Sequence, residues 1–259
     1  MLEIKSLVRN VIQKAGYDIR RRGSFKEGIL DPEIASISQF QYDGGDYRFL
    51  VANPKDVIQS RHVTGVFYEP EELSTIKEFY DPSRTFVDVG ANVGNHAIYA
   101  GKGLGASRVV CFEPGQIQHC LLTVNLLLND MAERTSVRKV AVSDGPGEVY
   151  MEADWADNLG GMTVSSRNRG ELVRLTTLDA ELLDEDVSFL KIDVEGLELK
   201  VLAGATETIN RCRPTVLIEV RAENEAAFLK SLENLEYSVA ARMTPHDDSF
   251  FNALIVPTE

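Results

Sequence analysis

From Thr85 onward, short apolar runs alternate with longer segments whose apolar residues recur at helical spacing. This alternation is typical of parallel strands joined by crossover helices. Strands are predicted at residues 85–90, 108–113, 135–142, 187–193 and 214–220, and helices near residues 95–104, 116–129, 197–210 and 223–233. Two last β segments, residues 237–243 and 251–256, predict an antiparallel closing hairpin. The pattern therefore predicts a doubly wound α/β fold with a mostly parallel sheet.

Residues 1–80 differ from this pattern. The turn signals Asp31-Pro32, Asp43-Gly-Gly45 and Asn53-Pro54 separate short β-prone runs, which predicts a small hairpin. A helix is expected from about Glu71 to Phe79, where Asp81-Pro82 ends it. We expect residues 1–80 to form an α/β cap or lid segment and residues 81–259 to form the main domain.

An insertion at residues 145–178 interrupts the alternation. Its ends, residues 147–151 and 172–176, are strand-like and flank a polar loop from Asp154 to Gly170. The loop contains the single tryptophan, Trp155. Because long loops in compact domains are usually functional or mobile, we expect this loop to border a binding site.

Charge and composition restrict the function classes. The net charge of −13 argues against nucleic acid as a partner, because Lys and Arg supply most of the affinity for phosphates. The three cysteines lack metal-binding spacing, which favours a reducing cytoplasm. No apolar run approaches the ~20 residues of a membrane span.

The basic residues concentrate at the N-terminus. Residues 1–28 contain seven cations and three anions, a net charge of +4. Leu7, Val8, Val11 and Ile12 form an apolar stripe if this segment is helical. Packing of the stripe on the main domain or on a second subunit, which would make a homodimer, is favoured over anchoring to a membrane surface.

The strongest indication of chemistry lies in Thr85-Phe-Val-Asp-Val-Gly-Ala-Asn-Val-Gly94, a strand that breaks into a glycine turn. Nineteen residues after Gly94, Glu113 ends the next apolar strand. Close-approach backbone amides and an acid for ribose hydroxyls are what a nucleoside ligand requires, at the ~20-residue spacing of dinucleotide sites. Asp88 stands where a phosphate would lie and would repel it. The pattern therefore favours S-adenosylmethionine over NAD.

Four segments together resemble the FkbM family of S-adenosylmethionine-dependent methyltransferases. They are Phe86-Val-Asp-Val-Gly-Ala-Asn-Val-Gly94, Phe112-Glu-Pro114, Lys191-Ile-Asp-Val-Glu-Gly-Leu-Glu198 with Val201-Leu-Ala-Gly-Ala205, and Pro214-Thr-Val-Leu-Ile-Glu219. The resemblance runs from about Pro70 to near the C-terminus, in the family's order. It implies a class I methyltransferase domain at residues 81–259, with a seven-stranded Rossmann-like sheet in the order 3-2-1-4-5-7-6. It also implies methyl transfer to a hydroxyl group of a sugar or polyketide-like metabolite.

The expected cofactor site follows the strand ends. The turn residues are expected to contact the methionine part, Glu113 the ribose, and the end of the third strand the adenine, while Asp88 reaches the ammonium directly or through water. The predicted cofactor-binding residues are Asp88, Gly90, Ala91, Asn92, Gly94, Glu113, Val142, Ser143 and Asp193, with Ala141 beside them. Tyr68 and Glu69 are expected near the methionine end.

The expected catalytic residues are Glu195, Asp193 and His246. Period-two alternation places Leu190 and Ile192 on one face of the fourth strand, so Asp193 emerges at the carboxyl edge of the sheet, and Glu195 follows in the turn. An aliphatic hydroxyl requires a general base, and these acids are candidates for that role. The rival interpretation of Glu195 is a carboxylate that caps the following helix.

Histidines are weaker candidates. His246 lies in the last loop, where class I enzymes often receive substrate, although a solvated histidine is the favoured interpretation there. His96 follows the glycine turn, and a surface or satisfied histidine is favoured over one that lines the pocket. We expect no metal: Asp193 and Glu219 end adjacent strands, but two ligands alone do not make a Mg²⁺ site, and activity is expected to survive chelation.

The function predicted from the sequence is a cytoplasmic O-methyltransferase that uses S-adenosylmethionine and a small-molecule or glycan acceptor. Two alternatives stay open. A small-molecule N-methyltransferase would share the cofactor site, although the chain lacks the Asn/Asp-Pro-Pro-aromatic run of many amine-specific enzymes. A methyltransferase-like binding protein without turnover is the other.

Overall fold

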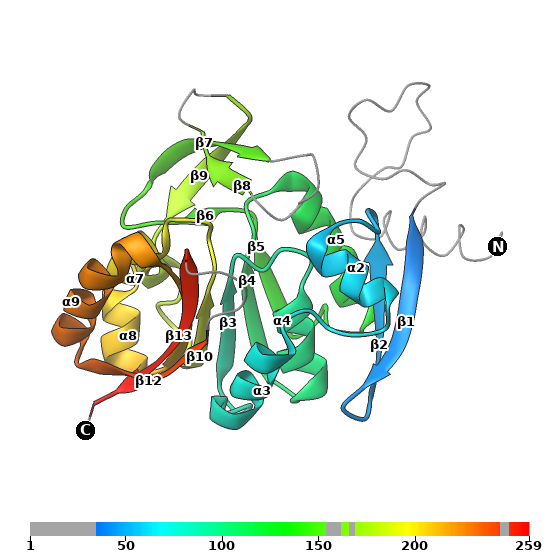
Figure 1. The fold of residues 1–259 in the computed structure, drawn as a ribbon, viewed down its shortest axis with the longest axis horizontal. Helices are drawn as coiled ribbons and strands as arrows, with labels where there is room; N and C mark the ends of the chain where they lie inside the picture. Colours follow the sequence, from blue (N-terminus) through cyan, green and yellow to red (C-terminus); the bar gives the residue numbers. More distant parts are fainter. Residues whose placement is uncertain (1–34, 154–161, 166–168, 244–248, 259) are drawn as a thin grey trace.

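The central element of the protein is a seven-stranded sheet in the order β12-β13-β11-β10-β3-β4-β5 (Figure 1). The computed structural model describes residues 35–153, 162–165, 169–243 and 249–258. The strands are β3 (Thr85–Val89), β4 (Arg108–Phe112), β5 (Thr135–Arg138), β10 (Val187–Ile192), β11 (Thr215–Arg221), β12 (Tyr237–Met243) and β13 (Phe250–Pro257). β13 runs antiparallel to both of its neighbours, and the other pairs are parallel. The predicted α/β fold with a mostly parallel sheet is confirmed; numbered along the chain, its strands lie in the order 3-2-1-4-5-7-6.

Helices cover both faces of this sheet, because residues of the central strands alternate between two apolar clusters. Val87 and Leu190 join one cluster with residues of the helices α6 (Leu178–Glu181), α7 (Glu198–Ala203), α8 (Thr206–Cys212) and α9 (Glu225–Leu235). Phe86 and Phe189 stack in the other cluster. That face carries α3 (Pro70–Phe79), α4 (Asn95–Ile98), the π-helical turn η1 (Tyr99–Gly103) and α5 (Gln116–Leu128). Period-two burial of this kind is what fixes the register of a doubly wound sheet.

Two predicted helices are interrupted. The helix expected near residues 95–104 is α4 followed by the π-helical turn, and the helix expected at 197–210 is divided into α7 and α8. Gly204 lies at the division, and a Cβ atom there would stand 2.1 Å from the carbonyl oxygen of Ser143. Within the described residues, no helix has both the length and the apolar character that a membrane crossing requires.

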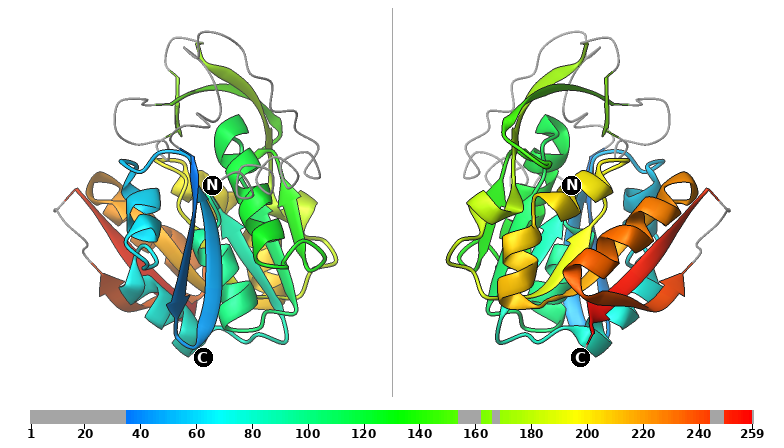
Figure 2. Two further views of the ribbon diagram at one scale, coloured as in Figure 1. Left: turned by 90° about the vertical axis from the view of Figure 1, so that its right-hand side faces the viewer. Right: turned by 90° about the vertical axis from the view of Figure 1, so that its left-hand side faces the viewer.

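A second sheet of four strands, in the order β6-β9-β7-β8, lies beyond the carboxyl ends of the central strands (Figures 1 and 2). It consists of β6 (Ala141–Val142), β7 (Gly147–Ala153), β8 (Met162–Val164) and β9 (Glu171–Thr176). The predicted strand at 135–142 is therefore wrong as one strand, because β5 and β6 belong to different sheets. β7 and β9 confirm the two strand-like ends of the insertion. β8 was not predicted, and residues 154–161 and 166–168 of the expected loop lie outside the described residues.

The segment before the main domain contains a hairpin of β1 (Ser36–Tyr42) and β2 (Gly45–Val51) that turns at Asp43-Gly44. The predicted hairpin and α3 are confirmed, whereas α2 (Val57–Val63) was not predicted. Figure 2 shows the hairpin on the outer side of the helix layer. There Asn125 of α5 accepts a hydrogen bond from the Leu50 amide at 2.7 Å. The hairpin therefore packs on a face of the domain rather than over the carboxyl edge, and the division at residue 80 stays a prediction.

Candidate functional site

A cavity of about 810 Å³ lies at the carboxyl ends of β3, β4, β10 and β11. Crevices at this edge are where open α/β sheets bind their ligands. The glycine turn after β3, residues 112–114 and 140–142, and residues 191–197 form much of its wall. Val57 and Ile58 of α2 and Tyr68 and Glu69 complete it from the N-terminal segment. The structure thus brings most of the predicted cofactor residues together.

The glycine turn is tightly constrained by the strands around it. Gly90 has a φ of +85°, and a Cβ atom there would stand 1.8 Å from the carbonyl oxygen of Asp193. Its amide donates to the Phe112 carbonyl at 2.9 Å. Gly94, with a φ of +90°, packs against Leu122 and does not line the cavity. Gly90, Ala91 and Asn92 do line it, so the turn exposes its backbone to a ligand at these three residues.

We expect Gly90→Ala to destabilise the protein by about 1–3 kcal/mol more than Gly105→Ala and to abolish ligand binding. Gly105 also has a positive φ, of +76°, but a Cβ atom there would meet nothing within 4 Å. The pair therefore separates backbone strain from the overlap with β10. Urea unfolding and calorimetry of S-adenosylhomocysteine binding measure the two effects. Equal loss of stability in both variants would contradict the close approach of the two strands.

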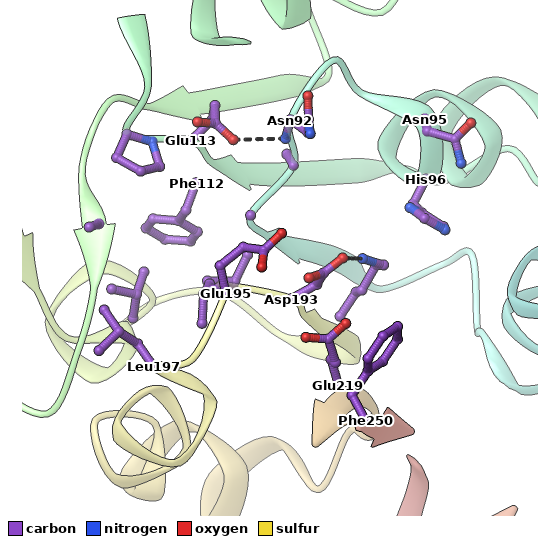
Figure 3. A pocket seen from close by; sticks show the side chains of 18 of the residues that line it. Asn92, Asn95, His96, Phe112, Glu113, Asp193, Glu195, Leu197, Glu219 and Phe250 are labelled. Atoms are coloured by element: carbon purple, nitrogen blue, oxygen red, sulfur yellow. Dashed lines mark hydrogen bonds and ion pairs between the residues drawn. The ribbon is translucent and has the colours of Figure 1, made fainter. Parts of the chain in front are cut away.

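Glu113 occupies the position that the sequence predicts for the ribose acid. Its carboxylate accepts hydrogen bonds from the backbone amides of Asn92 and Gly115, both at 2.8 Å. Figure 3 shows the bond from Asn92. The residue is 5% exposed and lines the cavity. Burial raises the pKa of Glu113 to about 7, although the two amides favour its charged form. Each carboxylate oxygen has a second lone pair, so Glu113 retains acceptor capacity for a ligand.

Asp88 lies deeper than predicted. It is 1% exposed and is not among the residues that line the cavity, so its carboxylate is not placed to contact a ligand there directly. Burial raises the pKa of Asp88, whereas Lys191 and His96 oppose this shift. Neither of its oxygens accepts a hydrogen bond of normal geometry, although the Ala97 amide also favours the charged form. Asp88 therefore contributes negative potential behind the glycine turn rather than a cavity surface.

The region predicted for adenine is largely apolar. Ala141 and Val142 of β6 line the cavity together with Phe112 and Met151 of β7. Ser143 does not line it: the residue is 2% exposed, and its hydroxyl donates to the Asp144 carboxylate at 3.0 Å. Met151 was not predicted, because the pairing of β7 and β9 that carries it to the cavity connects residues far apart in the chain.

Acidic side chains gather at the ends of β10 and β11 (Figure 3). Asp193, Glu195 and Glu219 all line the cavity. Lys191, also in the wall and 4% exposed, donates to Asp193 at 3.0 Å. Burial would lower the pKa of Lys191, but the surrounding carboxylates raise it well above its ordinary value. No role for Lys191 is predicted from the sequence, because alternation alone does not show that its amine reaches the Asp193 carboxylate at the strand end.

The pKa values of Glu195 and Glu219 are both raised above those of ordinary glutamates. Burial, followed by the nearby Asp193 carboxylate, raises the pKa of Glu195, and Arg221 opposes this. The same two causes raise the pKa of Glu219 to about 8. Glu195 also has a φ of +56°, a strained conformation for a residue other than glycine. Such strain is commonly found at functional sites.

His96 lines the cavity together with Glu69, and both side chains lie beside the buried Glu72. Its Nε2 atom lies 3.5 Å from Glu69 and 3.3 Å from Glu72, which is 4% exposed. Burial and the neighbouring Glu72 raise the pKa of Glu69 to about 9. The interpretation of His96 as a surface histidine is therefore wrong. Glu72 was missed, although its spacing of three residues from Glu69 at a helix start offered an indication.

Two predicted features fall in segments that the structure does not describe. His246 and residues 154–161 lie outside the described residues. The neighbouring Ser249 and Phe250 do line the cavity, which places the start of β13 in its wall.

Comparisons with known proteins agree with this geometry. Residues 88–239, more than half of the chain, match the methyltransferase FkbM domain family. The hexuronic acid methyltransferase AglP of Haloferax volcanii is 27% identical over 203 residues, covering 75% of this chain and 76% of that protein. The methyltransferase sdnD of Sordaria araneosa is 28% identical over 163 residues, 49% of this chain and 62% of that protein.

Solved structures also align with the chain. One is the methyltransferase FkbM from Methylobacillus flagellatus KT, which is 21% identical with a TM-score of 0.48. That match covers 76% of this chain and about half, 52%, of the other. A ribosomal protein L11 methylase from Lactobacillus delbrueckii subsp. bulgaricus aligns with a TM-score of 0.49 at 14% identity, covering 76% and 82% of the two chains.

Proposed function

Because the chain belongs to the FkbM family of methyltransferases, we propose that its cavity binds S-adenosylmethionine and that the enzyme methylates a hydroxyl group of a sugar or related metabolite. The observation that carries the proposal is the position of Glu113. Its buried carboxylate lies beside the exposed backbone of the glycine turn, and both belong to one cavity. This combination is the one that a nucleoside with free ribose hydroxyls requires.

The residues present fit the cofactor along its whole length. Phe112, Val142 and Met151 offer an apolar surface to a purine, and Glu113 offers acceptor oxygens to a ribose. The Gly90–Asn92 backbone and Tyr68 line the end expected for the methionine part. A bound sulfonium ion would favour the ionised form of the acids in the wall and be stabilised by it, whereas the same acids would repel a pyrophosphate. This charge supports S-adenosylmethionine over a dinucleotide.

When bound, the cofactor supplies a methyl group that its sulfonium already activates, so the protein's main task is to align the acceptor. Glu195 and Asp193 lie at the strand end that faces the expected reaction centre. Asp193 is paired with Lys191 and is suited to hold an acceptor hydroxyl. The pKa of Glu195 is raised by burial, which makes this carboxylate a stronger base toward the hydroxyl proton. Glu195 is therefore our first candidate for the base.

The acidic wall also characterises the acceptor. Carboxylates accept hydrogen bonds from hydroxyl groups, so a neutral polyol such as a sugar can satisfy several of them at once. The same wall would attract an amine, which keeps small-molecule N-methylation as a second candidate.

Product analysis tests the function. The purified enzyme would be incubated with labelled S-adenosylmethionine and a panel of sugars, sugar nucleotides and amines, and the products identified by NMR. We expect an O-methyl resonance with a hydroxyl acceptor. An N-methyl product would establish the second candidate instead, and tighter binding of NAD than of S-adenosylhomocysteine would overturn the cofactor assignment.

Cofactor affinity should depend on pH through Glu113. Its pKa in the free protein is about 7, and ribose hydroxyls donate best to the ionised form. Affinity for S-adenosylhomocysteine is therefore expected to be lost as the pH falls through 7, by up to about tenfold between pH 8 and pH 6. Calorimetry across this range measures the slope. Glu113→Gln, which cannot ionise, should reduce the slope; an unchanged slope would assign the effect to other groups.

A further inference from the structure

Three side chains that end within one small volume offer ligand atoms to a cation. Glu69 and Glu72 come from the start of α3, and His96 comes from α4. One carboxylate oxygen of each glutamate and the histidine Nε2 all lie within 4.8 Å of one another. It is the one group of three His, Cys, Asp or Glu ligands that the described part of the chain contains. Two of the three, Glu69 and His96, line the cavity.

Two of these atoms are buried without a hydrogen-bond partner. Glu72 is 4% exposed and His96 is 6% exposed, yet neither the Oε2 of Glu72 nor the Nε2 of His96 makes a hydrogen bond. Leaving buried polar groups unsatisfied costs ~1–3 kcal/mol each, and more for charged groups. Both atoms point toward each other at 3.3 Å. A cation between them would therefore interact favourably with both atoms.

The spacing fits coordination better than direct hydrogen bonding. A metal ion bound at ~2.1 Å by nitrogen and oxygen would separate its ligands by roughly 3.0–3.4 Å in octahedral or tetrahedral geometry. The distances from His96 to Glu72 and Glu69, 3.3 and 3.5 Å, are close to this range. Two carboxylates and a neutral imidazole would balance a divalent charge.

Neither glutamate is used to cap its own helix, and one of them is oriented by a distant strand. The other oxygen of Glu72 accepts a hydrogen bond from the Asn252 side chain of β13, which orients the carboxylate. Glu69 stands at the N-cap of α3 but makes no capping bond with its side chain.

We propose that Glu69, Glu72 and His96 bind a divalent transition-metal ion of the Mn²⁺ or Zn²⁺ class at the edge of the cavity. Imidazole and carboxylate together suit these ions better than Mg²⁺ or Ca²⁺, which prefer oxygen ligands only. The proposal is independent of the proposed reaction, since metal binding requires neither cofactor nor acceptor. It replaces the sequence-based expectation of no metal, which considered only Asp193 and Glu219.

Titration of the metal-free protein tests the site. After EDTA treatment and removal of the chelator, Mn²⁺ binding would be followed by the loss of the free-ion EPR signal and Zn²⁺ binding by calorimetry. We expect one ion per chain, and a rise in the unfolding temperature because the ion binds the folded state. Glu72→Gln should weaken binding at least about tenfold. Glu71→Gln is the matched control, since Glu71 is exposed on the same helix, and it should bind as the wild type does.

A second measurement needs no variant. Electron spin-echo modulation of the Mn²⁺-loaded wild type should show a coordinated imidazole nitrogen, because one of the three ligands is His96. Binding without this signature would place the ion at carboxylates such as Asp193 and Glu219 and overturn the proposal. Absence of any binding of millimolar Mn²⁺ or Zn²⁺ would also overturn it. If the wild type binds no metal and Glu72→Gln lowers the affinity for S-adenosylhomocysteine, the cluster would instead be assigned to the cofactor's ammonium.

Discussion

Replacing Glu195 with glutamine is expected to lower methyl-transfer turnover by roughly 10²–10⁴-fold, the range that a general base contributes. Glu195 lies at the end of β10, lines the cavity, and has a pKa raised by burial and by Asp193. Glutamine preserves the size of the side chain but cannot accept a proton. Glu195 is not expected to contact the cofactor. Affinity for S-adenosylhomocysteine should therefore stay within about twofold of the wild type, so that the loss appears in turnover and not in cofactor binding. Single-turnover kinetics and calorimetry measure the two quantities.

Glu223→Gln provides a matched control for this experiment. Glu223 also lines the cavity but is exposed, so its substitution removes one negative charge without removing a buried base. Asp193→Asn is less direct, since it would leave the buried amine of Lys191 without its partner. Wild-type turnover in Glu195→Gln and Asp193→Asn alike would leave orientation alone as the mechanism. A cofactor-bound structure with both carboxylates more than ~8 Å from the methyl group would exclude proton transfer even through one water.

Replacing Glu113 with alanine is expected to lower affinity for S-adenosylhomocysteine by at least about tenfold. The variant would lose charge-assisted hydrogen bonds to the ribose, each contributing ~1.5–3 kcal/mol, while a factor of ten corresponds to ~1.4 kcal/mol. It would also leave the buried amides of Asn92 and Gly115 without their acceptor. The glycine turn should therefore loosen, which adds to the loss.

Two comparisons separate these contributions. Glu113→Gln retains one acceptor oxygen for the amides and should lose less affinity than the alanine variant. Glu171→Gln removes a neighbouring carboxylate that pairs with Lys139 and does not line the cavity, so it should bind normally. The unfolding temperature of each variant shows whether loss of the acceptor for the turn amides has destabilised the fold. Unchanged affinity in a folded Glu113→Ala variant would remove the basis for the cofactor site.

The order of apolar runs and glycines along the chain was sufficient to predict the main sheet and the position of the cavity. β3, β4 and β10 are buried on both faces, so most of their residues are apolar, although β3 also contains Asp88 and β10 contains Lys191. Parallel strands bring their carboxyl ends to one edge, and for this reason Gly90, Glu113 and Asp193 were expected together. The facing of Leu190 into the core and of Lys191 to the other side follows from period-two alternation alone.

Features that depend on contacts between distant segments were decided only by the tertiary structure. The division between α7 and α8 occurs where Gly204 meets the backbone of Ser143, a contact that no local propensity shows. Likewise, β6 belongs to the second sheet because it pairs with β9, and the short β8 pairs with β7. Strand pairing is a property of two segments. A single run of residues therefore indicates that a strand forms, but not which sheet it joins.

The same distinction between local sequence and distant contacts applies to the site. The spacing of residues along the chain located the glycine turn and the acids, because each lies at the end of one strand. It did not show that Asp88 would be sealed behind the turn, nor that Glu72 and His96, on different helices, would meet with unpaired atoms. Side-chain depth and the meeting of charges depend on how helices pack against the sheet, and only the folded chain determines that.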